Sequence, residues 1–181
     1  LRDTISRSNA ARILLHPAIL VRRALMRRHD SAFDRLAENL QKCLAEDPIV
    51  RLEEFQGTFL LDRRSHLFAR VVSDGFYEPE LAAACVANLD ATRDAIDVGA
   101  NAGLYTNLMA RQLTGGRVLA IEPAANALVK LRSNVKRNGI EASTLVFEGV
   151  ASDRECTRTL KIVAGKEEYS SVGTLAHPSI V

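Results

Sequence analysis

Two spacings of hydrophobic residues alternate along the chain from about residue 79 onward. Short, continuous apolar runs are typical of buried strands, whereas apolar residues three and four positions apart are typical of helices that bury one face. The pattern predicts strands at 95–97, 117–121 and 143–147 and helices at 79–89, 106–113 and 124–138. The expected buried residues of the first helix are Leu81, Ala84, Cys85 and Leu89, and those of the last are Leu128, Leu131 and Val135, with Gly139 ending it.

The segment before residue 79 has a weaker pattern. Apolar residues at helical spacing between Phe33 and Leu44 predict a helix that ends near Pro48. Residues 55–62 predict a strand, and the polar residues 63–65 a turn. A hairpin-like segment at 158–163 and a loop of small residues at 169–174 follow the third parallel strand. We divide the chain into a helical N-terminal extension at 1–50 and an α/β domain at 51–181.

Alternating strands and helices with short connections indicate an open parallel sheet with right-handed crossovers, and therefore an α/β fold of the Rossmann-like kind. Ligands of such sheets bind beyond the carboxyl ends of the strands. Asp97, Glu122 and the segment 148–150 fall at those ends.

The most informative segment is the turn between the first parallel strand and its helix, Asp97-Val-Gly99-Ala-Asn101-Ala-Gly103. Glycines allow close backbone approach to a ligand, and the helix that follows presents unpaired N–H groups. A dinucleotide turn would carry a third glycine where this chain has Leu104. The spacing fits S-adenosylmethionine better, because its ammonium group favours a carboxylate such as Asp97. An ordinary strand-to-helix turn is the alternative.

Glu122 ends the second parallel strand about 20 residues after the glycine turn. A carboxylate in this place accepts hydrogen bonds from the two hydroxyls of a ribose, in nicotinamide enzymes as well. It therefore supports an adenosine ligand without choosing between the cofactors. Taken alone, such a residue is more often a solvated loop acid.

The chain resembles the FkbM-type S-adenosylmethionine-dependent methyltransferases. The matching segments are Gly75-Phe-Tyr-Glu-Pro79, Ile96-Asp-Val-Gly-Ala-Asn-Ala-Gly-Leu-Tyr-Thr106, Ile121-Glu-Pro123, Asn134 and Val150-Ala-Ser-Asp153. The resemblance implies a class I methyltransferase fold, S-adenosyl-L-methionine as cofactor, and O-methylation of a hydroxyl on a small molecule such as a sugar or polyketide. Family members continue with further strands, including a segment like Lys-Ile-Asp-x-Glu-Gly. We therefore expect a domain truncated after about three parallel strands, without the acceptor-binding half.

The expected cofactor contacts follow from this geometry. Asp97 anchors the ammonium directly or through water, Glu122 holds the ribose, and the end of the third strand borders the adenine, with Val150 either on its face or in the core. The full set of cofactor-binding candidates is Asp97, Gly99, Ala100, Asn101, Gly103, Glu122, Gly149 and Val150.

A hydroxyl acceptor must also lose its proton to a general base. The resemblance implies that Tyr77 and Glu78 lie over the cofactor or the acceptor. Glu78 and His66 are therefore candidates for the catalytic base, and the half that we expect to be absent is a better place for that group. An acid at a helix N-terminus, favoured by the helix dipole, is the alternative for Glu78.

Composition and charge limit the functional classes to which the chain can belong. With 24 basic and 22 acidic residues, the chain has no overall electrostatic footprint for nucleic acid. Seven arginines lie within the first 30 residues. This segment could be a helix that binds a membrane surface or a partner, or a transit peptide. We favour a third interpretation, a helix that packs on the domain and leaves its arginines in water. Three widely spaced cysteines indicate reduced thiols and a cytoplasmic protein. No His or Cys spacing suggests a metal site.

Two other functional classes remain open. A nicotinamide-dependent oxidoreductase would use the same strand-turn-helix, although the absent third glycine argues against it. A non-catalytic remnant of a methyltransferase is the other, favoured by the early end at Val181.

Overall fold

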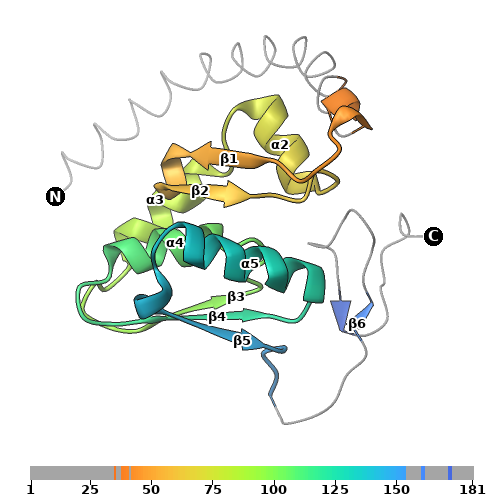
Figure 1. Ribbon diagram of the computed structural model, residues 1–181. Helices are drawn as coiled ribbons and strands as arrows, with labels where there is room; N and C mark the ends of the chain where they lie inside the picture. Colours follow the sequence, from red (N-terminus) through yellow and green to blue (C-terminus); the bar gives the residue numbers. More distant parts are fainter. Residues whose placement is uncertain (1–34, 36–37, 41, 154–159, 162–170, 173–181) are drawn as a thin grey trace, which may run out of the picture.

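The computed structural model describes residues 35, 38–40, 42–153, 160–161 and 171–172 (Figure 1). Its strands are β1 (Ile49–Leu52), β2 (Gly57–Leu60), β3 (Ala95–Val98), β4 (Val118–Glu122), β5 (Thr144–Glu148), β6 (Leu160–Lys161) and β7 (Ser171–Val172). Its α-helices are α2 (His66–Asp74), α3 (Pro79–Asn88), α4 (Leu104–Gln112) and α5 (Ala125–Arg137), with 3-10 turns at Glu53–Phe55 and Glu141–Ser143. The described residues between 35 and 43 are helical as well.

The centre of the fold is a parallel sheet with the strand order β3-β4-β5. Ala95 pairs with Val118 and Val118 with Thr144, so the three strands start in register and their carboxyl ends meet at one edge. Helices α4 and α5 lie along one face of this sheet (Figure 1). The predicted α/β class with three parallel strands is therefore confirmed.

A second layer covers the outer side of α4 and α5. It is the antiparallel hairpin β1–β2, accompanied by α2 (Figure 1). Phe55, Phe59 and Leu61 of this layer are fully buried and belong to one hydrophobic cluster with Leu104 and Leu108 of α4. The other face of the helical layer packs through Leu128 and Leu131 onto the sheet. The helices are thus buried on two sides.

Side-chain amides tie the hairpin to the helices. Asn134 of α5 and Asn138, the residue that caps the C-terminus of that helix, each exchange a pair of hydrogen bonds with the backbone of β2, at Leu60 and Thr58 respectively. Asn107 of α4 donates to the carbonyl of Phe55 at 2.7 Å. Gly57 lies where this approach is closest, since a Cβ there would come within 2.6 Å of the Asn107 amide nitrogen.

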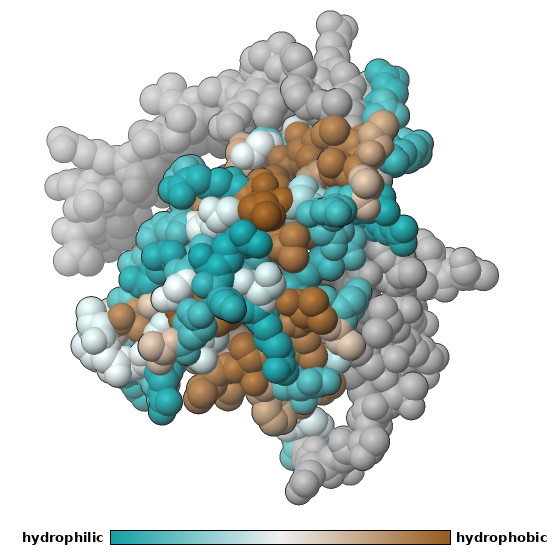
Figure 2. All heavy atoms as spheres, viewed as in Figure 1, coloured by the Kyte–Doolittle hydropathy of each residue, from teal (hydrophilic) through white to brown (hydrophobic). Residues whose placement is uncertain are grey.

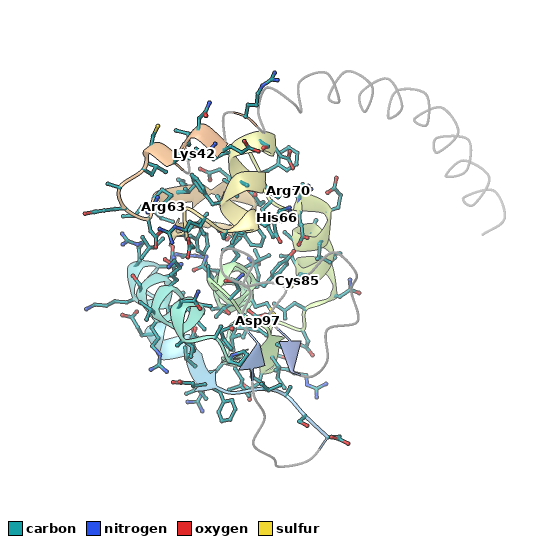
Figure 3. The ribbon with its side chains drawn as sticks, turned by 90° about the vertical axis from the view of Figure 1, so that its right-hand side faces the viewer. Lys42, Arg63, His66, Arg70, Cys85 and Asp97 are labelled. Atoms are coloured by element: carbon teal, nitrogen blue, oxygen red, sulfur yellow. The ribbon has the colours of Figure 1, made fainter. Side chains whose placement is uncertain are left out.

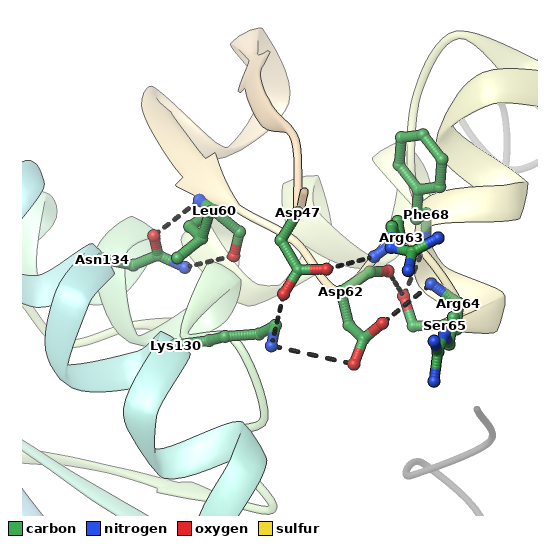
Figure 4. Close-up of polar contacts among 9 residues, drawn as sticks. All are labelled: Asp47, Leu60, Asp62, Arg63, Arg64, Ser65, Phe68, Lys130 and Asn134. Carbon is green, nitrogen blue, oxygen red and sulfur yellow. Dashed lines mark hydrogen bonds and ion pairs between the residues drawn. The ribbon is translucent and has the colours of Figure 1, made fainter. Parts of the chain in front are cut away.

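An ion cluster joins the same two layers (Figure 4). The Lys130 ammonium on α5 lies 2.9 Å from a carboxylate oxygen of Asp47 and 3.7 Å from one of Asp62. Asp47 also accepts a hydrogen bond from the backbone N–H of Arg63. Burial acts to raise the pKa of Asp47, but this hydrogen bond and Lys130 outweigh it, so the pKa lies below its ordinary value.

Several sequence-based predictions need correction. Residues 55–62 are not one strand: a 3-10 turn ending at Gln56, which has a φ of 51°, folds 49–60 into a hairpin. The predicted boundary at residue 50 falls inside β1. The sequence analysis predicts a turn at 63–65 and no helix after it, whereas the structure has helix α2 there. Ser65 is the N-cap of this helix, since its hydroxyl accepts a hydrogen bond from the N–H of Phe68 at 3.0 Å. Serine is common in turns as well as in caps, so the sequence does not distinguish the two.

Two burial predictions also differ. On α3, Leu81 is 54% exposed and Ala84 is exposed, whereas Ala82 is buried and packs with Cys85. The predicted buried stripe of α5 is confirmed, and Gly139 follows that helix with a φ of 66°.

The C-terminal hairpin pairs different segments from those that the sequence predicts. Strand β6, within the hairpin-like segment, pairs antiparallel with β7, which lies in the predicted small-residue loop. The arginine-rich first 30 residues and Cys156 lie outside the described residues.

One apolar face of the sheet is left uncovered by the part of the chain that the structure describes. Because side chains alternate along a strand, the residues opposite to the helices are exposed: Ile96 at 63%, Val98 at 62%, Leu145 at 49% and Phe147 at 54%. No helix of the described part of the chain covers this face, and apolar residues gather on the lower side of the molecule, where β4 and β5 lie (Figure 2). Parallel sheets are normally covered on both faces.

The first prediction concerns the ion cluster. Lys130→Gln should lower the free energy of unfolding at pH 7 by about 1–2 kcal/mol, since it leaves two partly buried carboxylates without their cation. A carboxyl whose pKa is lowered by folding stabilises above its unfolded pKa and loses this contribution on acidification. The difference between wild type and variant should therefore shrink below about pH 4. Urea denaturation across pH measures it, and the exposed Lys136→Gln on the same helix is the control; equal losses for both variants would contradict it.

The second prediction concerns the uncovered sheet face. The 181-residue chain should bind the dye ANS and self-associate, because a contiguous apolar surface is exposed. Phe147→Lys should reduce both effects. Val129→Lys, which replaces a 68% exposed valine on α5, should not. Dye fluorescence and size-exclusion chromatography with light scattering provide the measurement, and a monomer that binds no dye would show that this face is covered in solution.

Candidate functional site

The glycine turn between β3 and α4 is an unusual stretch of backbone. Gly99, Asn101 and Gly103 have φ values of 80°, 48° and 82°, in the left-handed region. The N–H groups of Gly99 and Ala100 both donate to the carbonyl of Ile121, at 2.9 and 3.1 Å, which pins the turn to the end of β4. Glycine removes the steric cost at two of the three positions, but Asn101 must be held by its surroundings.

Glu122 provides part of that support. Its side chain is only 7% exposed, and its carboxylate accepts the N–H of Asn101 and the N–H of Ala124, each at 2.8 Å. The residue lies at the glycine turn, as the sequence predicts, but its two oxygens each bind a backbone group. Each carboxylate oxygen has a second lone pair, so acceptor capacity remains.

Asp97 lies beside Glu122 at the same edge of the sheet. It accepts a hydrogen bond of 2.5 Å from the hydroxyl of Thr106, in the first turn of α4. Burial raises the pKa of Asp97 above its ordinary value, the Glu122 carboxylate adds to the rise, and the hydrogen bonds from Thr106 offset only part of it. No ion pair of the described residues includes either carboxylate. Among the described residues, neither carboxylate at the turn therefore has a cationic partner.

The two glycines of the turn differ in what surrounds them. A Cβ placed on Gly99 would have no atom of the described residues within 4 Å, so space is open there. A Cβ on Gly103 would come within 2.6 Å of a methyl carbon of Leu131 on α5. The close approach predicted for Gly103 is thus to a neighbouring helix, and Ala100, 6% exposed, also packs in the core. Of these residues, Gly99 and Asn101 remain accessible to a ligand.

The end of β5 lies beside the same edge. The N–H of Gly149 donates to the carbonyl of Glu122 at 3.3 Å, which brings the two strand ends together. Val150 is 42% exposed, so it is a surface residue and not a core residue. Glu148 is exposed and pairs with Arg132 at 3.4 Å.

A second cluster lies on the other side of the turn. The Tyr105 hydroxyl donates to the exposed Glu78 carboxylate at 3.1 Å. Glu78 has a φ of 45° directly before Pro79, an unfavourable conformation for this position, and its side chain makes no capping hydrogen bond to α3. Burial, and then Glu78, raise the pKa of Tyr105. Burial also raises the pKa of Cys85, with a contribution from Asp97.

Figure 3 shows Cys85 near Asp97, and His66 at the start of α2. The structure therefore brings Glu78 near the turn through Tyr105. The sequence did not identify Thr106 as the partner of Asp97, or Tyr105 as the partner of Glu78. Their place in the first helical turn after Gly103 is the signal that could have identified them.

A small cavity of about 10 Å³ lies behind the turn. The residues that line this cavity come from the turn, from the segment around Ser65 and from α5: Asn101, Ala102, Asp62, Ser65, Leu67, Asn126, Ala127 and Lys130. This volume holds about one water molecule and is too small for a nucleoside. The described residues contain no group of three or more potential metal ligands and no helix long and apolar enough to cross a membrane.

Comparisons with known proteins give partial structural likenesses. No protein-family model and no curated protein matches the sequence. Among solved structures, the chain is similar to an O-methyltransferase from Bacillus cereus in complex with SAH, with 16% identity over 66% of this chain and 52% of that one and a TM-score of 0.41. It is also similar to M. jannaschii TYW2 in complex with AdoMet, with 20% identity over 56% of this chain and 42% of that one and a TM-score of 0.43.

A third likeness is to precorrin-6y C5,15-methyltransferase from Geobacter metallireducens, with 19% identity over 41% of this chain and 40% of that one and a TM-score of 0.36. The chain spans between about a third and about half the length of the solved structures it matches.

The third prediction concerns the charge at the turn. Asp97→Asn should raise the free energy of unfolding at pH 7, by about 1 kcal/mol, because it removes a half-buried charge and keeps an acceptor for Thr106. A carboxyl with a raised pKa costs stability once it is ionised, so the advantage of the variant should vanish as the pH falls below both pKa values. Urea denaturation between about pH 3 and 8 tests this. The exposed Glu141→Gln is the control, and a destabilised Asp97→Asn variant would contradict the prediction.

Proposed function

We propose that the chain is the cofactor-binding part of an S-adenosylmethionine-dependent methyltransferase. The observation that carries this proposal is the pair of carboxylates, Asp97 and Glu122, that flank an open glycine turn without a basic partner in the described part of the chain. Such a site favours a ligand with positive charge. The ammonium and sulfonium groups of S-adenosylmethionine provide that charge, whereas the pyrophosphate of a dinucleotide would be repelled.

In this proposal Asp97 holds the ammonium, directly or through water, while the methionine part lies above Gly99 and Asn101. The remaining lone pairs of Glu122 accept the ribose hydroxyls. Gly149 and the exposed Val150 border the adenine. Ala100 and Gly103 support the turn from behind and contribute through its backbone.

The proposed reaction is O-methylation of a hydroxyl on a small molecule, such as a sugar or polyketide, as in the FkbM family that the sequence resembles. The acceptor oxygen attacks the methyl carbon, the S–CH₃ bond breaks, and its electron pair stays on sulfur to give S-adenosylhomocysteine. The protein must align the acceptor with the S–CH₃ bond and exclude water. The acceptor proton passes to a base, for which the exposed Glu78 carboxylate is the candidate among the described residues.

The uncovered apolar sheet face favours a second candidate function. A methyltransferase-like domain that lacks the layer over this face would bind the cofactor but have no complete acceptor site, and would act as a non-catalytic remnant. Binding together with absence of methyl transfer to any hydroxyl acceptor would favour it.

The fourth prediction tests the cofactor. In titration calorimetry S-adenosylhomocysteine should bind and NAD should not. Gly99→Val should abolish binding, because the side chain fills the open space above the turn. Gly139→Val is the matched control, since Gly139 has a positive φ of 66° and a Cβ placed there would have no described atom within 4 Å, yet it lies at the far end of α5. Tighter binding of NAD, or binding retained by Gly99→Val, would overturn the assignment.

A further inference from the structure

The outer edge of β2 is paired with side chains and not with a strand. Successive residues on one strand edge lie about 6.8 Å apart, and residues four apart on a helix rise by about 6 Å. Two amides one helical turn apart can therefore match two backbone positions of a strand. Asn138 pairs with Thr58 through hydrogen bonds of 2.9 and 2.9 Å, and Asn134 pairs with Leu60 through hydrogen bonds of 2.7 and 3.0 Å.

The two asparagines differ in their remaining contact. The Asn138 amide nitrogen also donates to the carbonyl of Asn134 in its own helix, at 2.9 Å. The Asn134 amide nitrogen instead donates to the carbonyl of Ala102, in the glycine turn, at 2.8 Å. Asn134 is 1% exposed. One buried side chain thus joins the hairpin, α5 and the turn.

The hydrogen bond from Asn134 reaches the part of the turn whose backbone conformation is least favourable. Ala102, 2% exposed, stands between Asn101 and Gly103, both with positive φ. Glu122 binds the N–H of Asn101 from one side, and Asn134 binds the carbonyl of Ala102 from the other. Without Asn134 this buried carbonyl would lose its partner, and the orientation of the peptide group after Ala102 would no longer be fixed.

We propose that Asn134 is a positioning residue for the cofactor, which makes the binding conformation of the glycine turn depend on the docked hairpin. The inference rests on the proposed S-adenosylmethionine site at that turn. Asn134 does not touch the cofactor itself; it acts through Ala102.

The matched pair Asn134→Ala and Asn138→Ala tests the proposal, because each variant loses both hydrogen bonds to β2 and only the first loses the bond to the turn. Both should unfold at lower urea concentration. Under conditions where each variant is folded, Asn134→Ala should weaken S-adenosylhomocysteine binding by about tenfold or more, the scale of one lost buried hydrogen bond, and Asn138→Ala by less than about twofold. Equal weakening, or an unchanged affinity of Asn134→Ala, would overturn the proposal.

A readout without ligand separates this inference from the proposed function. Amide hydrogen exchange at 101–104 should accelerate in Asn134→Ala and not in Asn138→Ala. If wild type fails to bind S-adenosylhomocysteine, the proposed function fails, while this exchange result still decides whether Asn134 holds the turn. If Asn134→Ala does not fold, the near-isosteric Asn134→Leu takes its place, since it fills the same volume, buries no charge and has no donor for Ala102.

Discussion

The pairing of α5 with the edge of β2 is the constraint on which the rest of the structure depends. An exposed strand edge leaves backbone groups without partners, and burying it unpaired would be costly. The carboxamides of Asn134 and Asn138 satisfy those groups and set the distance between the hairpin and the helical layer. The same close approach requires glycine at position 57, because a side chain there would collide with Asn107 and Asn138. Phe55 and Phe59 are fully buried between these layers.

The glycine turn has a different physical character on each of its sides. Behind it, Gly103 packs on Leu131, and Asn134 binds Ala102. In front, Gly99 is open and two carboxylates lie without a cation in the described part of the chain. The proposed S-adenosylmethionine site makes use of both sides, since a turn that its neighbours already order loses little conformational freedom on binding.

The sheet is asymmetric in the same way. Its helical face is closely packed, with Val118 and Ala120 fully buried, whereas Ile96, Val98, Leu145 and Phe147 on the opposite face remain exposed. The chemistry of methyl transfer needs an acceptor held against the cofactor with water excluded. In the proposed function, the described residues provide the cofactor side of such a site, and the exposed face of the sheet is not part of it.

The sequence by itself determined the α/β class, the three parallel strands, the three helices after residue 79 and the placement of Asp97 and Glu122 at one sheet edge, because each follows from local periodicity and from the rule that parallel strand ends meet. It also indicated the S-adenosylmethionine turn, which stays a prediction. Tertiary structure decided the rest. The hairpin register, the burial of Ala82 in place of Leu81, the packing of Gly103 on Leu131 and the backbone hydrogen bonds of Glu122 depend on partners that lie up to 80 residues away in the chain. No local pattern encodes which amide of α5 will meet which carbonyl, since that is set only when the layers pack.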